Sequence, residues 1–189
     1  MSGNYRDFTL ARDEVSASSA GGAPFLLCYG ATFIITGILA FFLPRETSAL
    51  IAMFQGGIAL PLAFWLERRW GTKRMSPDNP LTKLSAQLAV SQALAIPFLI
   101  VVYNVNPAQI PVILAGLGGV HFMPYGWLHR TQIYIILGSA LALGSFALVL
   151  LLGLSTSYPY ILLFVGFAYF IATPLVYRHA KQIVTTATP

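Results

Sequence analysis

Six long apolar runs separated by short polar turns constrain this chain more than any other feature. The hydrocarbon core of a bilayer needs about 20 predominantly apolar residues to be crossed by a helix. Each run is about that long, and each must be helical because backbone amides without partners are costly in hydrocarbon. We therefore expect an all-α, polytopic transmembrane bundle of about six helices. The runs cover residues 24–43, 47–66, 81–103 (beginning at 81 or 84), 108–128, 131–152 and 158–177.

The composition supports lipid as the solvent of most of the chain. Hydrophobic residues make up 57% of the 189 residues and charged residues only 9%, whereas soluble domains carry roughly 25% charged residues. A soluble protein of this composition would expose large apolar patches. The net charge of +5 comes from basic residues at the ends of the apolar runs. We therefore expect a lipid bilayer, and not a nucleic acid, as the partner.

Lysine and arginine mark one side of the predicted bundle. Six crossings place both terminal segments, the 67–83 loop and the 129–130 turn together. Cytoplasmic loops of membrane proteins carry an excess of Lys and Arg, so we expect both termini in the cytoplasm. The opposite side holds only Arg45. The basic residues on the shared side are Arg6, Arg12, Arg68, Arg69, Lys73, Arg74, Lys83, Arg130, Arg178 and Lys181.

The polar ends of the chain suggest a simple domain organisation. Residues 1–22 are polar and small, which predicts a flexible cytoplasmic tail, and residues 182–189 predict a second flexible tail. Residues 23–181 form the predicted six-helix transmembrane domain. Similar tripeptides, Phe-Leu-Pro at 42–44 and Phe-Met-Pro at 122–124, suggest a three-plus-three pseudo-repeat of inverted halves.

The acidic residues argue against several kinds of chemistry. None of them lies well inside an apolar run, so the sequence shows neither a carboxylate relay nor a carboxylate metal cage in the core. Cys28 is the only cysteine and cannot form an internal disulfide. We find no catalytic motif, and we expect no enzymatic activity, no cofactor and no bound metal. The acidic residues are Asp7, Asp13, Glu14, Glu46, Glu67 and Asp78.

His121 is the one ionisable side chain well inside an apolar run. It lies seven residues before Leu128, or about 10 Å inside the run at 1.5 Å per residue. On a helix, Tyr125 and His129 lie on the same face as His121. Pro124 cannot donate to the carbonyl of Val120 and leaves that oxygen free. His121 is therefore either a ligand contact in a lined cavity or an interhelical hydrogen-bonding group that only stabilises the bundle.

Other polar side chains lie at the same expected depth as His121. Gln87 and Ser91 are one turn apart near the cytoplasmic end of the third run, and Tyr169 and Thr173 are one turn apart near that end of the sixth. These positions suggest a polar pocket that opens to the cytoplasm between the third, fourth and sixth helices. Its expected ligand-binding residues are His121, Tyr125, Gln87, Ser91, Tyr169 and Thr173.

The segment around His121 carries the one resemblance to a known family. The stretch His-Phe-Met-Pro-Tyr-Gly-Trp-Leu at 121–128, followed by Arg130, Thr131 and Tyr134, resembles an uncharacterised family of bacterial multi-helix integral membrane proteins without assigned function. The resemblance implies a multi-pass protein of the cell inner membrane. It implies no substrate and no catalytic residue.

Two functions stay open from the sequence. The first is a protein that binds or transports a small molecule through the cytoplasm-facing pocket. The second is a non-catalytic membrane scaffold or accessory subunit whose polar groups only hold helices together. The pocket predicts that water reaches His121, whereas the scaffold predicts a dry, fully paired imidazole. A homo-oligomer is compatible with both functions.

Overall fold

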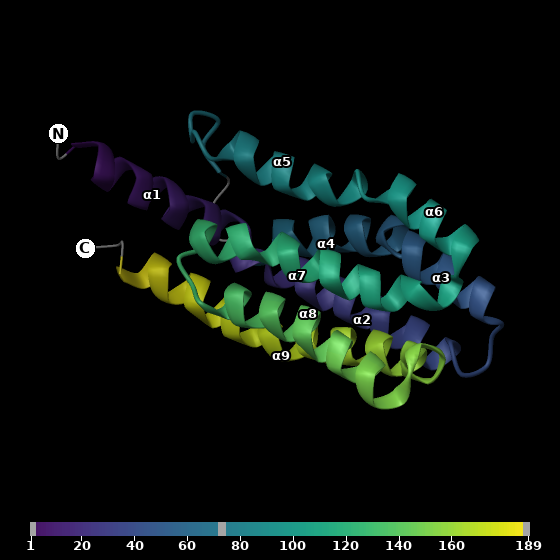
Figure 1. Ribbon diagram of the computed structural model, residues 1–189. Helices are drawn as coiled ribbons and strands as arrows, with labels where there is room; N and C mark the ends of the chain where they lie inside the picture. Colours follow the sequence, from purple (N-terminus) through teal and green to yellow (C-terminus); the bar gives the residue numbers. More distant parts are fainter. Residues whose placement is uncertain (1–2, 72–74, 187–189) are drawn as a thin grey trace.

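The computed structural model of the protein describes residues 3–71 and 75–186, and this part of the chain is helical without a β-strand. Figure 1 shows the helices running side by side along one long axis. The expected all-α bundle is therefore confirmed. Its helices are α1 (Gly3–Ser18), α2 (Ala23–Leu39), α3 (Arg45–Phe54), α4 (Gly56–Trp70), α5 (Thr82–Ala93), α6 (Ile96–Val105), α7 (Ile110–Leu128), α8 (Ile133–Leu152) and α9 (Leu154–Thr186), with short 3-10 helices η1 (Ala20–Gly22) and η2 (Pro107–Gln109).

Among the described residues, four helical segments are long and apolar enough to cross a membrane. They are Ala20–Leu39, Arg45–Trp70, Ile133–Leu152 and Leu154–Ile183. Large apolar side chains along them, such as Ile35, Leu151 and Ile171, are exposed on the outside of the bundle. Only an apolar solvent makes so much exposed hydrophobic surface stable.

The six apolar runs correspond to six rods in the structure. Two of the rods are interrupted: α3 and α4 form one, and α5 and α6 form another. The helix α7 forms a further rod beside α8 and α9 (Figure 1). The turn expected over residues 153–157 is shorter than predicted, because Gly153 alone separates α8 from α9. Gly153 has a φ of 76°, a left-handed conformation that glycine adopts at little cost.

Glycines allow two pairs of helices to approach closely. A methyl group on Gly119 of α7 would lie 2.6 Å from the carbonyl oxygen of Gly138 in α8. A methyl group on Gly30 of α2 would lie 3.1 Å from the carbonyl oxygen of Gly166 in α9. Small residues at such crossings are typical of membrane helices, which gain stability from close packing.

The N-terminal segment differs from the flexible tail predicted over residues 1–22. Residues Gly3–Ser18 form α1, which packs against α7 and α9. Gly21 and Gly22 have φ values of 65° and 81° and turn the chain from α1 into α2. The Tyr134 hydroxyl donates a hydrogen bond to the carbonyl of Gly21 and holds this turn against α8.

At the other end of the chain, α9 continues to Thr186, through much of the tail predicted over residues 182–189; residues 187–189 lie outside the described part. Lys73 and Arg74 of the predicted basic loop also lie outside it.

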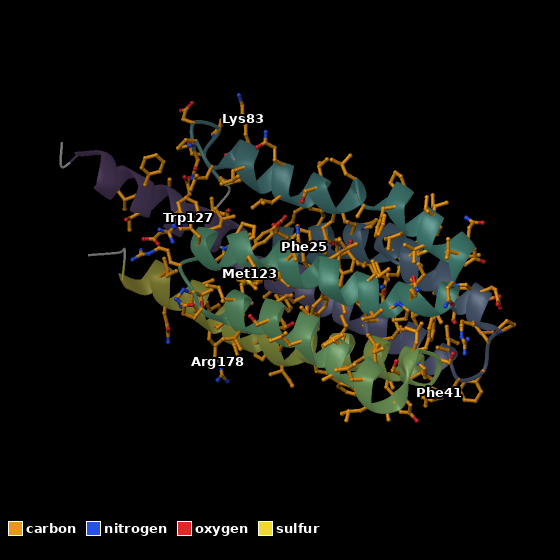
Figure 2. The ribbon with its side chains drawn as sticks, viewed as in Figure 1. Phe25, Phe41, Lys83, Met123, Trp127 and Arg178 are labelled. Atoms are coloured by element: carbon orange, nitrogen blue, oxygen red, sulfur yellow. The ribbon has the colours of Figure 1, made fainter. Side chains whose placement is uncertain are left out.

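Charged side chains gather at the end of the bundle where α1 packs. Figure 2 shows Lys83, Trp127 and Arg178 toward this end and Phe41 at the opposite one. Arg12 and Arg130 lie at the same end as Lys83, because Arg12 contacts Trp127 and Arg130 pairs with Asp13 of α1. Arg45 begins α3 near Ser155, which follows the turn from α8 to α9. Arg12, Lys83, Arg130 and Arg178 therefore lie at one end of the bundle, and Arg45 lies at the other.

Candidate functional site

The face of α7 predicted to carry the site is a column of aromatic rings, one turn apart. The ring centroids of His121 and Tyr125 are 5.0 Å apart, and those of Tyr125 and His129 are 5.8 Å apart with nearly parallel planes. The column forms because residues four apart lie one above another on a helix. Tyr134 of α8 packs against it, 5.4 Å from the His129 ring.

Tyr169 joins the column to α9. Its ring meets that of Phe122 edge-on at 5.5 Å, and Phe122 in turn stacks on Tyr134 at 5.5 Å. The Tyr169 hydroxyl lies 3.2 Å from where a methyl group on Gly118 would lie, so the glycine makes room for the phenol. Tyr169 is buried, and the structure brings it into the same cluster as His121 and Tyr125.

Thr173 lies beside Tyr169 but uses its hydroxyl locally. It is buried, and its Oγ1 donates to the carbonyl of Tyr169 at 2.8 Å within α9. This bond is the usual way in which a threonine satisfies its hydroxyl inside a membrane helix. The Thr173 hydroxyl hydrogen is therefore already used.

Gln87 and Ser91 do not enter the buried cluster. Both are exposed on α5, and the Ser91 hydroxyl donates to the carbonyl of Leu88 at 2.7 Å. The helix α5 packs through Leu84 and Leu88 against an apolar cluster that contains Leu128. Burial of these leucines is more favourable than burial of the Gln87 side-chain amide, so the apolar face of α5 is the one that turns inward.

Gln92 joins α5 to α7 by a hydrogen bond, although it was not among the residues predicted to line the pocket. Its Nε2 donates to the carbonyl of Leu117 at 3.5 Å. Leu117, His121 and Tyr125 are four residues apart in turn and share one face of α7. The imidazole of His121 is consequently on the side of α7 that meets α5.

The imidazole of His121 is half-buried. Its ring contacts are with Phe122 and Tyr125. Within residues 3–71 and 75–186, its ring nitrogens form no hydrogen bond to another side chain or to the backbone. A neutral imidazole offers one donor and one acceptor, so His121 retains the capacity to bind a polar group.

The structure adds a second histidine site at the end of the column, built around His129. A hydrogen bond of 3.0 Å joins His129 Nδ1 to Ser16 Oγ of α1. His179 of α9 donates through Nε2 to the carbonyl of His129 at 3.1 Å. The sequence already placed His129 on the same helix face as His121, eight residues earlier. The contact with Ser16 could not be predicted in this way, because it depends on the packing of α1 against α7.

Burial dominates the electrostatics of His129, which lies just beyond the end of α7. Its imidazole is enclosed, and this desolvation, followed by the proximity of His179, lowers the pKa of His129 below its ordinary value. Desolvation acts against the charged form of a titratable group. His129 is therefore neutral at physiological pH and acts as a hydrogen-bonding group rather than as a cation.

Ionic contacts of α1 surround this histidine. Asp13 pairs with Arg130 at 2.8 Å. The guanidinium of Arg12 lies over the Trp127 ring and donates to the Trp127 carbonyl. Burial, and then repulsion by Arg130, lower the pKa of Arg12, while Asp13 opposes them. These contacts hold α1 to the end of α7.

The described residues contain no cluster of three or more His, Cys, Asp or Glu side chains placed to hold a metal ion. The groups of the site are instead phenols, imidazoles and other aromatic rings. Such groups bind polar, uncharged or aromatic molecules through hydrogen bonds and ring contacts.

No curated protein and no solved structure matches this chain at a significant level. One protein family matches it, over residues 8–179, which include α2 to α8 in full and most of α1 and α9. The chain belongs to this family, whose description reads "Family of unknown function (DUF7010)".

Proposed function

We propose that this membrane protein binds a small molecule beside His121, between α5, α7 and α9, in a pocket that opens toward the cytoplasm. The observation that carries the proposal is a half-buried imidazole without a hydrogen-bonding partner in the described residues. Polar residues within a membrane are costly and frequently functional. Tyr125 contacts the His121 ring directly, and Tyr169 lies one ring farther away, against Phe122. On the α5 side, Gln92 donates a hydrogen bond to the Leu117 carbonyl of α7.

The topology proposed with this site follows from the distribution of charge. Six crossings, with both termini in the cytoplasm of a cell whose inner membrane holds the protein, place the α1 end of the bundle in the cytoplasm. His121 is then about 10 Å from that surface, at seven residues from Leu128 and 1.5 Å per residue. Neither a catalytic step nor a cofactor is part of the proposal.

A membrane scaffold or accessory subunit is the second candidate function. It is favoured by the internal pairing of the polar groups near His121. Thr173 bonds within α9, Ser91 bonds within α5, and the Tyr134 hydroxyl bonds to Gly21. Polar groups paired in this way stabilise a bundle without binding a ligand.

Accessibility of position 121 to water separates the two functions. In a Cys28→Ala background, His121→Cys is treated with a cationic, water-soluble methanethiosulfonate in everted membrane vesicles. The pocket predicts modification, because the reagent reaches a thiol only through water. Lys83→Cys, exposed on α5, is the positive control, and Ala115→Cys, buried on the same helix as His121, is the negative control.

If His121→Cys is as unreactive as Ala115→Cys, the proposed binding pocket is refuted, and the scaffold function is the candidate that is left. If it reacts, a second measurement compares the thermal midpoints of the wild type and of His121→Ala in detergent, with imidazole, amino acids and nucleosides as probes. Binding beside His121 predicts a probe-dependent rise in the midpoint that His121→Ala removes.

A further inference from the structure

The second rod of the bundle is broken inside its apolar segment. The span Arg45–Trp70 divides at Gln55, which separates α3 from α4. The Gln55 carbonyl accepts hydrogen bonds from the amides of both Ile58 and Ala59, each at 3.0 Å. Farther along, Pro61 has no amide hydrogen to donate to the carbonyl of Gly57. The carbonyl of Gly57, just beyond the break, therefore lacks the amide donor that a regular helix would supply.

The side chain of Gln55 is buried at this break without satisfying its acceptor. It is 7% exposed, and Oε1 has no hydrogen-bonding partner in residues 3–71 and 75–186. An unpaired acceptor buried in a low-dielectric interior is destabilising. Gln55 Oε1 can therefore accept a hydrogen bond from a donor that the described part of the chain does not supply.

The phenol of Tyr29 lies next to the break. A methyl group on Gly56 would lie 3.0 Å from the Tyr29 hydroxyl oxygen. Tyr29 belongs to α2 and packs in the main core as well as beside Ala59. A phenol both donates and accepts hydrogen bonds, so the break has a second polar group from a different helix within reach.

A second broken rod lies beside the first. Leu94 and Ala95 separate α5 from α6, and Pro97 cannot donate to the carbonyl of Ala93. The helix α6 contacts α3. Interrupted membrane helices are tolerated where protein or a polar cavity satisfies their backbone, and in many transporters such breaks form the substrate site.

We propose that the α3–α4 break binds a small, uncharged molecule that donates a hydrogen bond from an N–H or O–H group to Gln55 Oε1. Tyr29 supplies the second contact. The ligand is uncharged because the acidic residues of this rod, Glu46 and Glu67, are about 14 and 18 Å from Gln55 along the helices at 1.5 Å per residue. It is small because Gln55 is nearly enclosed and Tyr29 closely approaches Gly56. This site is separate from the one proposed at His121.

Two matched amides test the need for a donor. Acetamide carries N–H groups, whereas N,N-dimethylacetamide keeps the carbonyl and has none. Saturation-transfer NMR on the full chain in lipid nanodiscs measures how much signal each amide receives from the protein. We expect several-fold greater transfer to acetamide. We expect Gln55→Met, which preserves the length of the side chain and removes the acceptor, to abolish the difference.

Two further variants keep the outcome interpretable. Gln132→Met makes the same change at an exposed glutamine before α8 and should leave the preference intact. Gly56→Ala places a methyl group next to the Tyr29 hydroxyl and should weaken the preference for acetamide over N,N-dimethylacetamide. The thermal midpoint of Gln55→Met should equal or exceed that of the wild type, because an unpaired buried acceptor is removed.

Equal transfer to both amides, or transfer to neither, overturns the proposal and leaves water as the partner of Oε1. A preference for acetamide that survives in Gln55→Met overturns it as well. None of these results depends on whether water reaches His121.

Discussion

His129, at the end of α7, lies where three other helices meet it. Ser16 of α1 bonds its ring, Tyr134 of α8 packs against it, and His179 of α9 donates to its carbonyl. The surroundings leave no room for the solvation that an imidazolium needs. The protonation of this one residue is thereby linked to the packing of α1, α8 and α9.

Acidification should destabilise the protein through His129. Its pKa is lowered in the folded state, while the unfolded chain titrates near the ordinary value of about 6.5. Below that pH the unfolded chain binds more protons than the folded one, so stability falls as the pH falls, by up to about 1.4 kcal/mol per pH unit. Thermal midpoints between about pH 8 and pH 5 measure this effect. His129→Phe should flatten the dependence, and an unchanged slope in that variant would exclude His129 as its source.

Asn79 joins α1 to the segment before α5 through both ends of its amide. Its Nδ2 donates to the carbonyl of Ala11 at 3.0 Å and to Glu14 Oε2 at 2.7 Å, and its Oδ1 accepts from the amide of Leu81 at 2.9 Å. Glu14 Oε1 also accepts from the amide of Ser76 at 2.8 Å. The carboxylate makes these bonds stronger than neutral ones.

Removing this amide should loosen α1 without unfolding the bundle. Asn79→Ala leaves buried groups unpaired, at about 1–3 kcal/mol for each such loss. We expect faster amide hydrogen exchange over residues 8–18, measured by mass spectrometry in detergent, and little change in α8. Asp78→Ala alters an exposed neighbour and serves as the control. Equal exchange over residues 8–18 in both variants would show that Asn79 does not hold α1.

At the scale of elements, the crossing of α7 and α8 depends on glycine. Gly119→Ala would place its methyl group 2.6 Å from the carbonyl oxygen of Gly138, and such overpacking costs about 1–3 kcal/mol. Gly116→Ala on the same helix meets nothing within 4 Å and should be neutral or stabilising by up to about 1 kcal/mol, since alanine favours helices. Unfolding in mixed micelles compares the two. A Gly119→Ala variant as stable as Gly116→Ala would contradict the close crossing.

At the scale of the whole molecule, the sequence predicted the parts of the fold that lipid determines. Apolar length alone predicts the rods, because hydrocarbon forces each run to be helical. The column of His121, Tyr125 and His129 was also predictable, since residues four apart share a face of one helix.

The parts that depend on contacts between distant segments were not predictable. The helix α1 has a polar sequence, and its packing rests on partners such as Asn79 and Arg130 far along the chain. Gln87 was expected in the pocket from its position along the third run, but the apolar residues of α5 decide which face of that helix is buried. The break at Gln55 lies in a continuous apolar run, in which a pair of glycines does not by itself indicate an interruption.

A labelling measurement tests the transmembrane arrangement most directly. Single cysteines at Asp78, Arg178 and Glu46, all exposed positions, are introduced in a Cys28→Ala background and treated with a membrane-impermeant maleimide. Six crossings with a cytoplasmic basic end predict labelling of Glu46→Cys in intact cells, and of Asp78→Cys and Arg178→Cys only after permeabilisation. Labelling of Asp78→Cys and Arg178→Cys from opposite faces would contradict the proposed topology.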